Sequence, residues 1–156
     1  YDGENLVKGV YAGGYILGDE GSGGVLGKLL ISDWVKKQMP QDIYDALTAE
    51  YGLTYLGVVD RVYKQAFPNR WLAQFTKFMS AHREHPYIHS LLVEAFKAFF
   101  ERNIKQYDEW KTLEVGFVGS IAFYFNAELK EAADVCGIKL GRVMQNPIEG
   151  LVEYHR

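Results

Sequence analysis

A glycine-rich stretch near the start of the chain has the residue types best suited to holding a small polar ligand. Its sequence, GGYILGDEGSGG over residues 13–24, places Asp19 and Glu20 side by side among six glycines. Such a loop lets backbone amides and a carboxylate approach a ligand closely. The alternative is structural, because the acids could complement a helix dipole while the glycines form turns. From these residues alone, the two interpretations are about equally supported.

A second candidate site is the turn at Gly119-Ser120. Residues 113–118 predict a strand, residues 121–135 a helix, and residues 138–143 a second strand. Two strands joined by a crossover helix favour a parallel pair, and ligands collect beyond the carboxyl ends of such strands. Ser120 could instead simply cap the following helix, and without further motifs that interpretation is favoured.

The elements around these two sites follow from apolar periodicity and from turn residues. The glycine-rich loop is expected to lead into a helix from about residue 22 to residue 38. Further helices are expected over residues 42–51, along the stripes 71–79 and 92–104, and after Asn146-Pro147, whereas residues 5–11 predict a weak strand. Gly137 should end the helix that begins after the Gly119-Ser120 turn.

The composition of the chain limits the kinds of molecule that it is expected to bind. The chain has 156 residues, which suits one domain, and its net charge of -3 gives no electrostatic reason to bind nucleic acid or an anionic membrane. No apolar run reaches the roughly 18 residues of a membrane helix. The single cysteine, Cys136, requires no oxidising compartment. A cytoplasmic protein without nucleic-acid or membrane partners is therefore expected.

Three segments together resemble a known family. They are YILGDEGSGGVLGK at residues 15–28, VGFVGSIAFYF at 115–125 and NPIEGLVEY at 146–154. The first is similar to the GDEGS loop of N-acetylglucosamine kinases and of the BadF-type ATPases that activate benzoyl-CoA reductases. The second resembles the adenosine motif of the actin-like ATPase fold. This resemblance implies an α/β fold, the C-terminal lobe of the actin-like ATPase (ribonuclease H-like) fold, with a central mixed sheet and a large helical insertion.

The resemblance also implies site residues and cofactors. Gly13, Gly14 and Asp19 correspond to the family's sugar-binding loop, and a carboxylate suits vicinal sugar hydroxyls because charge-assisted hydrogen bonds are strong. Gly119, with Ser120 and Phe123, corresponds to the adenosine-binding turn. The implied activity is phosphorylation of an amino sugar, with N-acetylglucosamine as the first candidate, using ATP and Mg2+.

The family's phosphate loop and catalytic aspartate have no counterpart in these residues. We therefore expect residues 1–156 to form a single C-terminal lobe, whose start and whose N-terminal partner lobe lie outside the chain. That lobe would hold the general base, and the chain alone would be inactive because phosphoryl transfer depends on positioning. The expected partners are a small-molecule sugar, ATP, the remaining lobe and, as a candidate, a second copy of the protein.

Two other functions stay open at this stage. A reductase-activating ATPase shares both motifs but needs cysteines for an iron–sulfur cluster, and Cys136 alone cannot supply them. A sugar-sensing module without turnover would keep the same fold. A metal site could be formed by His82, His85 and His89. However, Pro86 interrupts the helix that would align these side chains, so exposed histidines around a loop are favoured and no metal site is expected.

Overall fold

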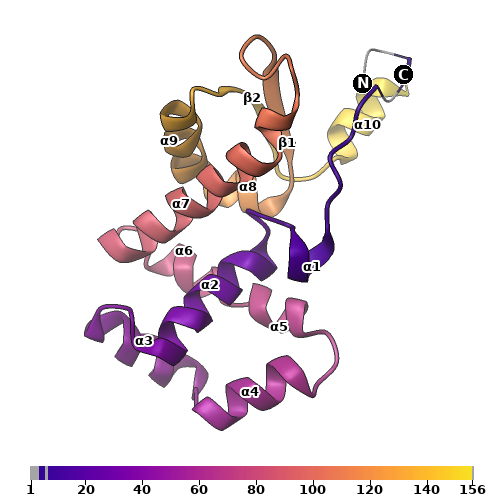
Figure 1. The fold of residues 1–156 in the computed structure, drawn as a ribbon. Helices are drawn as coiled ribbons and strands as arrows, with labels where there is room; N and C mark the ends of the chain where they lie inside the picture. The colour runs from indigo at the N-terminus through magenta and orange to yellow at the C-terminus, as the bar shows by residue number, and fades with distance from the viewer. Residues whose placement is uncertain (1–3, 6, 156) are drawn as a thin grey trace. The chain divides into compact units, whose positions relative to one another are not determined.

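The computed structural model describes residues 4–5 and 7–155, and within it the chain forms two compact units. Unit 1 comprises residues 1–20 and 93–156, and unit 2 comprises residues 21–92. The chain passes from one unit to the other directly after Glu20 and again within a long helix between Leu92 and Val93. Each unit has its own set of buried apolar side chains. Figure 1 shows the helices and strands along the chain.

Unit 2 consists entirely of helices. They are α2 (Gly23–Lys36), α3 (Gln41–Tyr51), α4 (Tyr55–Tyr63), α5 (Pro68–Ala73), α6 (Thr76–Ala81) and the first part of α7 (Pro86–Arg102). The expected helices at 22–38 and 42–51 are confirmed, with Ser22 accepting a hydrogen bond from the Val25 amide and Gly52 ending α3 in a left-handed conformation. The stripe at 71–79 divides between two short helices instead of forming one.

Aromatic side chains fill the core of unit 2. Phe75 and Phe78 are fully buried, and the ring of Tyr51 packs against both. Trp34 donates its indole N–H to Thr48 Oγ1 at 2.8 Å, which satisfies the polar end of an otherwise buried side chain. Tyr87 donates to Asp33 at 2.8 Å, and burial together with this carboxylate raises the pKa of the Tyr87 hydroxyl.

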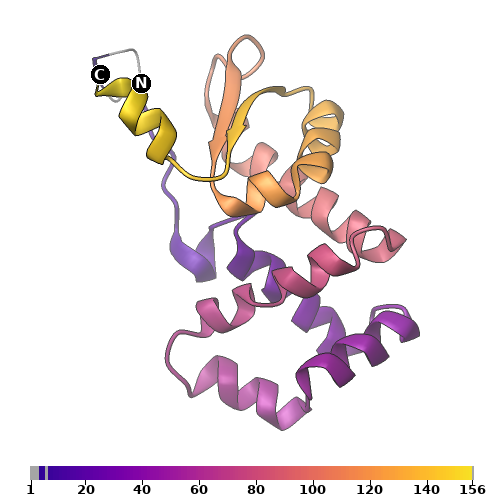
Figure 2. The ribbon, with the colours of Figure 1, turned by 180° about the vertical axis from the view of Figure 1, so that it is seen from behind.

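Unit 1 combines a small sheet with helices, which confirms the expected α/β class. Its elements are α1 (Gly14–Leu17), the remainder of α7, a 3-10 turn η1 (Ile104–Gln106), β1 (Glu114–Val118), α8 (Ser120–Tyr124), α9 (Asn126–Cys136), β2 (Lys139–Met144) and α10 (Ile148–Tyr154). Strands β1 and β2 are parallel, as the strand–helix–strand pattern predicts, and form a two-stranded sheet in the described part of the chain (Figure 2).

The register of the sheet contains one irregularity. Val115 pairs with Leu140 and Phe117 with Val143, so β2 uses one residue more than β1 over this stretch. An extra residue of this kind is a β-bulge, which bends the strand. Gly141 lies in the bulge, where a side chain would press against Glu114 at 3.2 Å. Glycine thus allows the two strands to remain paired up to the end of β1.

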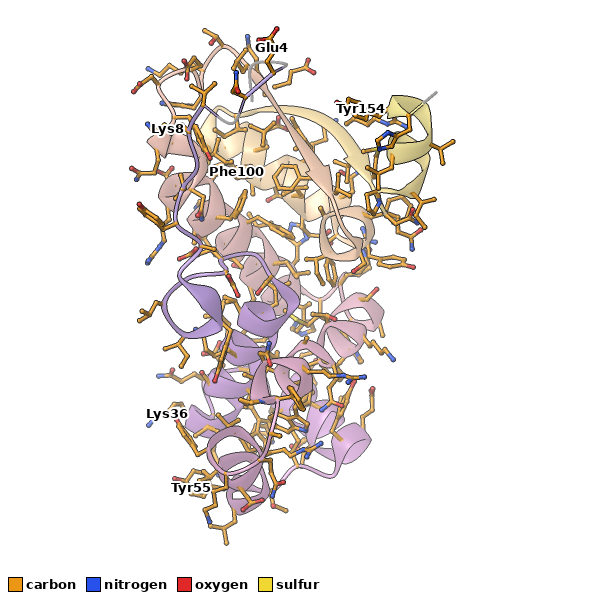
Figure 3. The ribbon with its side chains drawn as sticks, turned by 90° about the vertical axis from the view of Figure 1, so that its right-hand side faces the viewer. Glu4, Lys8, Lys36, Tyr55, Phe100 and Tyr154 are labelled. Carbon is orange, nitrogen blue, oxygen red and sulfur yellow. The ribbon has the colours of Figure 1, made fainter. Side chains whose placement is uncertain are left out.

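Phenylalanines from α7 and β1 pack together in unit 1. Phe99 and Phe100 both contact the ring of Phe117, at centroid distances of 5.6 and 6.1 Å. Phe100 is fully buried, whereas Tyr154 on α10 is 76% exposed (Figure 3). This packing holds the carboxyl-terminal half of α7 against the strand that leads to the Gly119 turn.

Two expectations for unit 1 are wrong in detail. No strand forms over residues 7–11, which have no regular secondary structure, and residue 6 lies outside the described residues. The helix expected at 121–135 is interrupted at Phe125, whose fully buried ring joins the core between α8 and α9. Gly137 ends α9 in the left-handed conformation, as expected.

The contact between α2 and α5 generates a prediction. A Cβ atom on Gly27 would lie 1.9 Å from the Leu72 carbonyl oxygen, so Gly27→Ala must push the two helices apart. We expect a loss of about 1 to 3 kcal/mol in the free energy of unfolding, the usual range for overpacking, measured by denaturant melts. Gly24→Ala in the same helix is the control, since its Cβ would meet Asn69 only at 3.5 Å. Equal stability of the two variants would contradict the close approach.

Candidate functional site

The glycine-rich segment forms a loop that folds back on itself. Gly13 and Gly14 both have positive φ, at 74° and 67°, and lead into the single turn of α1. The Gly18 amide donates to the Gly14 carbonyl, and the Asp19 amide donates to the Ala12 carbonyl. A Cβ on Gly18 would lie 1.8 Å from the Ala12 oxygen, so glycine is required at this crossing.

Asp19 follows that crossing in an unusual backbone conformation. Its φ of 56° is left-handed, which non-glycine residues adopt rarely, although aspartate is among those that tolerate it best. Its side chain is partly buried, and among residues 4–5 and 7–155 the carboxylate makes no hydrogen bond or ion pair. The loop therefore presents a carboxylate whose acceptor positions remain available to a ligand.

Glu20, the neighbouring acid, is engaged with the end of α7. Its carboxylate forms an ion pair with Arg102 Nε at 2.6 Å and accepts a hydrogen bond from Asn103 Nδ2 at 3.2 Å. The Glu20 side chain is only 14% exposed. The two adjacent acids thus differ in environment, and neither Arg102 nor Asn103 could be connected to the loop from the sequence, because they lie more than eighty positions away.

The Gly119 turn follows β1 directly, at the carboxyl end of the parallel pair. Gly119 has φ 143° and ψ 157°, a region that is essentially restricted to glycine, and its amide donates to the Met144 carbonyl at 2.8 Å. A Cβ at this position would meet no atom within 4 Å. The backbone at Gly119 is therefore open on the side where a side chain would otherwise project.

Ser120 and Phe123 lie on the short helix that begins at this turn. The Phe123 amide donates to the Gly119 carbonyl, and the Phe123 ring is 44% exposed beside Tyr124. Gly119 is the N-cap residue of α8, and no side chain caps this helix. The structural alternative, in which Ser120 caps α8, is wrong because Ser120 is already the first helical residue.

All six predicted site residues belong to unit 1. Gly13, Gly14 and Asp19 are brought together in one loop, and Gly119, Ser120 and Phe123 in one turn. No hydrogen bond or ion pair between the two sets occurs among the described residues. Each set therefore has its own local support.

The histidines and the cysteine have other environments. His82 stacks on Phe78 at 4.0 Å, and His85 lies 3.3 Å from Asp42 while its Nδ1 accepts from the Tyr87 amide. His82 and His85 lie in the loop between α6 and α7, as expected, and His89 lies in α7, but all three are partly buried where exposed side chains were expected. Cys136 is buried, and burial raises the pKa of its thiol. The described part of the chain contains no cluster of three metal-ligating side chains.

Comparison with known proteins defines the class. The chain superimposes on a crystal structure of a protein from Porphyromonas gingivalis, provisionally assigned as an N-acetylglucosamine kinase, with a TM-score of 0.95 and 42% sequence identity. The match covers 99% of this chain and 54% of that protein. The fold is therefore the α/β fold of a C-terminal lobe of a kinase-like protein, and the resemblance to the N-acetylglucosamine kinase family is confirmed.

Other comparisons add no further relatives. No model of a known protein family matches the chain, and no curated protein matches it significantly. Within the described residues, no helix has the length and apolarity needed to cross a membrane. The chain spans about half the length of the solved structure that it matches.

The crossing at Gly18 generates a prediction for the loop. Gly18→Ala should force the Ala12 carbonyl away and increase hydrogen exchange of the bonded amides of residues 18 and 19 by about tenfold or more, equivalent to a local loss of roughly 1.4 kcal/mol. Gly9→Ala is the control, because a Cβ on Gly9 would meet no atom within 4 Å. Exchange rates equal to those of the wild type in Gly18→Ala would contradict the described loop.

Proposed function

We propose that the protein containing this chain is an ATP-dependent kinase that phosphorylates a hydroxyl of an amino sugar, with N-acetylglucosamine as the first candidate. The observation that carries the proposal is the Asp19 carboxylate, which the loop presents without an ion-pair or hydrogen-bond partner among the described residues. An ionised carboxylate can accept bonds from two vicinal hydroxyls, each stronger than a neutral hydrogen bond. The similarity to a protein provisionally assigned as an N-acetylglucosamine kinase supports this substrate.

In this proposal, Gly13 and Gly14 shape the backbone on one side of the sugar. Their positive φ values turn the chain into α1 and so direct the following residues back toward Ala12. Asp19 then holds the sugar hydroxyls in a fixed orientation. Positioning of this kind contributes much of the rate in phosphoryl transfer, because the reaction needs the attacking and leaving oxygens in line.

The Gly119 turn is proposed to bind the nucleotide. ATP supplies the transferred phosphoryl group when bound, and the open backbone at Gly119 fits a flat adenosine group better than any side-chain-bearing residue would. Ser120 and Phe123 flank this backbone on α8. Mg2+ commonly binds through substrate phosphates and only one or two carboxylates, so it would accompany ATP rather than require a cluster of acids in this chain.

The general base and the phosphate-binding loop are proposed to lie in the part of the protein outside this chain, which would form an N-terminal lobe. The chain would then supply part of the sugar site and the adenosine site. We also propose that the protein is located in the cytoplasm and forms a homodimer. The alternative of a reductase-activating ATPase gains no support from Cys136, because its thiol is buried and unsuited to ligating an exposed cluster.

Asp19→Asn in the full-length protein tests the sugar site. Asparagine tolerates the left-handed backbone, so this change removes the charge while preserving the loop. We expect kcat/KM for N-acetylglucosamine to fall by about 10- to 150-fold, the equivalent of one charge-assisted hydrogen bond worth roughly 1.5 to 3 kcal/mol. ATP affinity measured by calorimetry should stay unchanged. A wild-type protein that phosphorylates no hexose or N-acetylhexosamine, or an Asp19→Asn variant with wild-type sugar kinetics, would overturn the proposal.

Gly119→Ala in the full-length protein tests the nucleotide site. The new methyl group would meet no protein atom but would project into the space proposed for adenosine, so ATP affinity should fall about tenfold or more. Gly137→Ala is a matched control, since Gly137 also has positive φ and no atom near its Cβ. The melting temperature of both variants should fall, because alanine is strained at a positive φ. Only Gly119→Ala should bind ATP weakly. If both variants lose ATP affinity to the same extent, or if both keep the wild-type affinity, the assignment of Gly119 to the adenosine site is wrong.

A further inference from the structure

The ion pair and hydrogen bond on Glu20 connect the GDEGS loop to the end of α7. Arg102 is the last residue of α7, and Asn103 follows it. The Asn103 side-chain amide also donates to the Phe99 carbonyl at 3.2 Å, which holds it at the helix end. We refer to the set Glu20, Arg102 and Asn103 as the latch.

The latch compensates an unfavourable position for a carboxylate. The carboxyl end of a helix carries partial negative charge from its unpaired carbonyl groups, so an acid placed there is repelled unless a cation stands beside it. Glu20 is mostly buried at this end, with 14% of its side chain exposed, whereas Arg102 is 64% exposed. Arg102 therefore supplies a positive charge that offsets this repulsion.

The latch is adjacent to the strained residue of the loop. Asp19 has φ 56°, and strained backbone conformations persist only where the surroundings determine them from several sides. On the amino-terminal side, Asp19 is held by the hydrogen bond to Ala12 and by the crossing at Gly18. On the carboxyl-terminal side, the next residue is Glu20, which is bonded to Arg102 and Asn103 at the end of α7.

From this geometry we infer that Arg102 and Asn103 are positioning residues, which act through Glu20 to hold the Asp19 carboxylate in its ligand-binding orientation. Their role rests on the proposed sugar site, but the latch itself is a property of the described loop. A carboxylate displaced by about 1 Å loses much of its effect on a bound substrate, so an indirect contact can influence binding strongly. Glu20 would not contact the sugar.

The closing experiment uses Arg102→Ala, Arg102→Lys, Glu20→Gln and the double variant Arg102→Ala/Glu20→Gln in the full-length protein. Lys64→Ala is the matched control, because Lys64 forms an exposed ion pair with Asp60 at 3.7 Å in unit 2. Two readouts are taken from each variant: amide hydrogen exchange of residues 12–20 without ligand, and steady-state kinetics with N-acetylglucosamine and ATP.

We expect Arg102→Ala to raise exchange of the hydrogen-bonded Gly18 and Asp19 amides about tenfold and to raise the sugar KM about tenfold, with kcat and the ATP KM changed less than about twofold. Arg102→Lys should recover part of both effects, because a single charge replaces the arginine. The double variant should exchange more slowly than Arg102→Ala, since the neutral amide introduced by Glu20→Gln is not repelled by the helix end. Lys64→Ala should match the wild type.

The two proposals fail in different ways. Unchanged exchange in Arg102→Ala would overturn the latch, whatever the kinetics. Faster exchange with an unchanged sugar KM would show that Arg102 stabilises the loop without positioning Asp19, and would also overturn the inference. If the wild-type protein phosphorylates no sugar, the proposed substrate fails; faster exchange in Arg102→Ala and partial rescue in the double variant would still support the latch as a brace of the Asp19 loop.

Discussion

The crossing of the chain at Ala12 and Gly18 is the constraint on which the candidate site depends. A side chain at Gly18 would overlap the Ala12 carbonyl, and this close approach directs the next residue, Asp19, into a left-handed conformation. Such a conformation costs on the order of 1 to 3 kcal/mol, which the surrounding bonds must offset. The site is thus organised first by backbone geometry, and the carboxylate takes its position from the backbone.

Charged contacts distinguish the two adjacent acids of this loop. Of the two adjacent acids, Asp19 is left without a partner in the described residues, while Glu20 is neutralised by Arg102. This difference follows from the position of Glu20 at the carboxyl end of α7, where an unpaired carboxylate would be repelled. Two chemically similar side chains therefore have different environments, one bonded to the end of α7 and the other without a partner among the described residues.

The separation into two units has a consequence for the whole protein. Every predicted site residue lies in unit 1, whereas unit 2 has an independent helical core built on Phe75 and Phe78. The solved structure that the chain matches is about twice as long, so the complete activity is a property to be tested on the full-length protein. Unit 2 accounts for the large helical insertion that the family resemblance implies.

Local features of the sequence determined most helices, the parallel strand pair and the Gly119 turn. Capping by Ser22, termination at Gly52 and Gly137, and apolar periodicity are local signals, since each depends on residues a few positions apart. The break at Phe125 was decided by tertiary packing, which buries its ring, whereas residues 7–11 are largely exposed and pair with no strand among the described residues. The bond between Glu20 and Arg102 joins residues 82 positions apart, so no local pattern could reveal it. Only the folded chain distinguishes Asp19, which has no partner among the described residues, from Glu20, which is bonded to the end of α7.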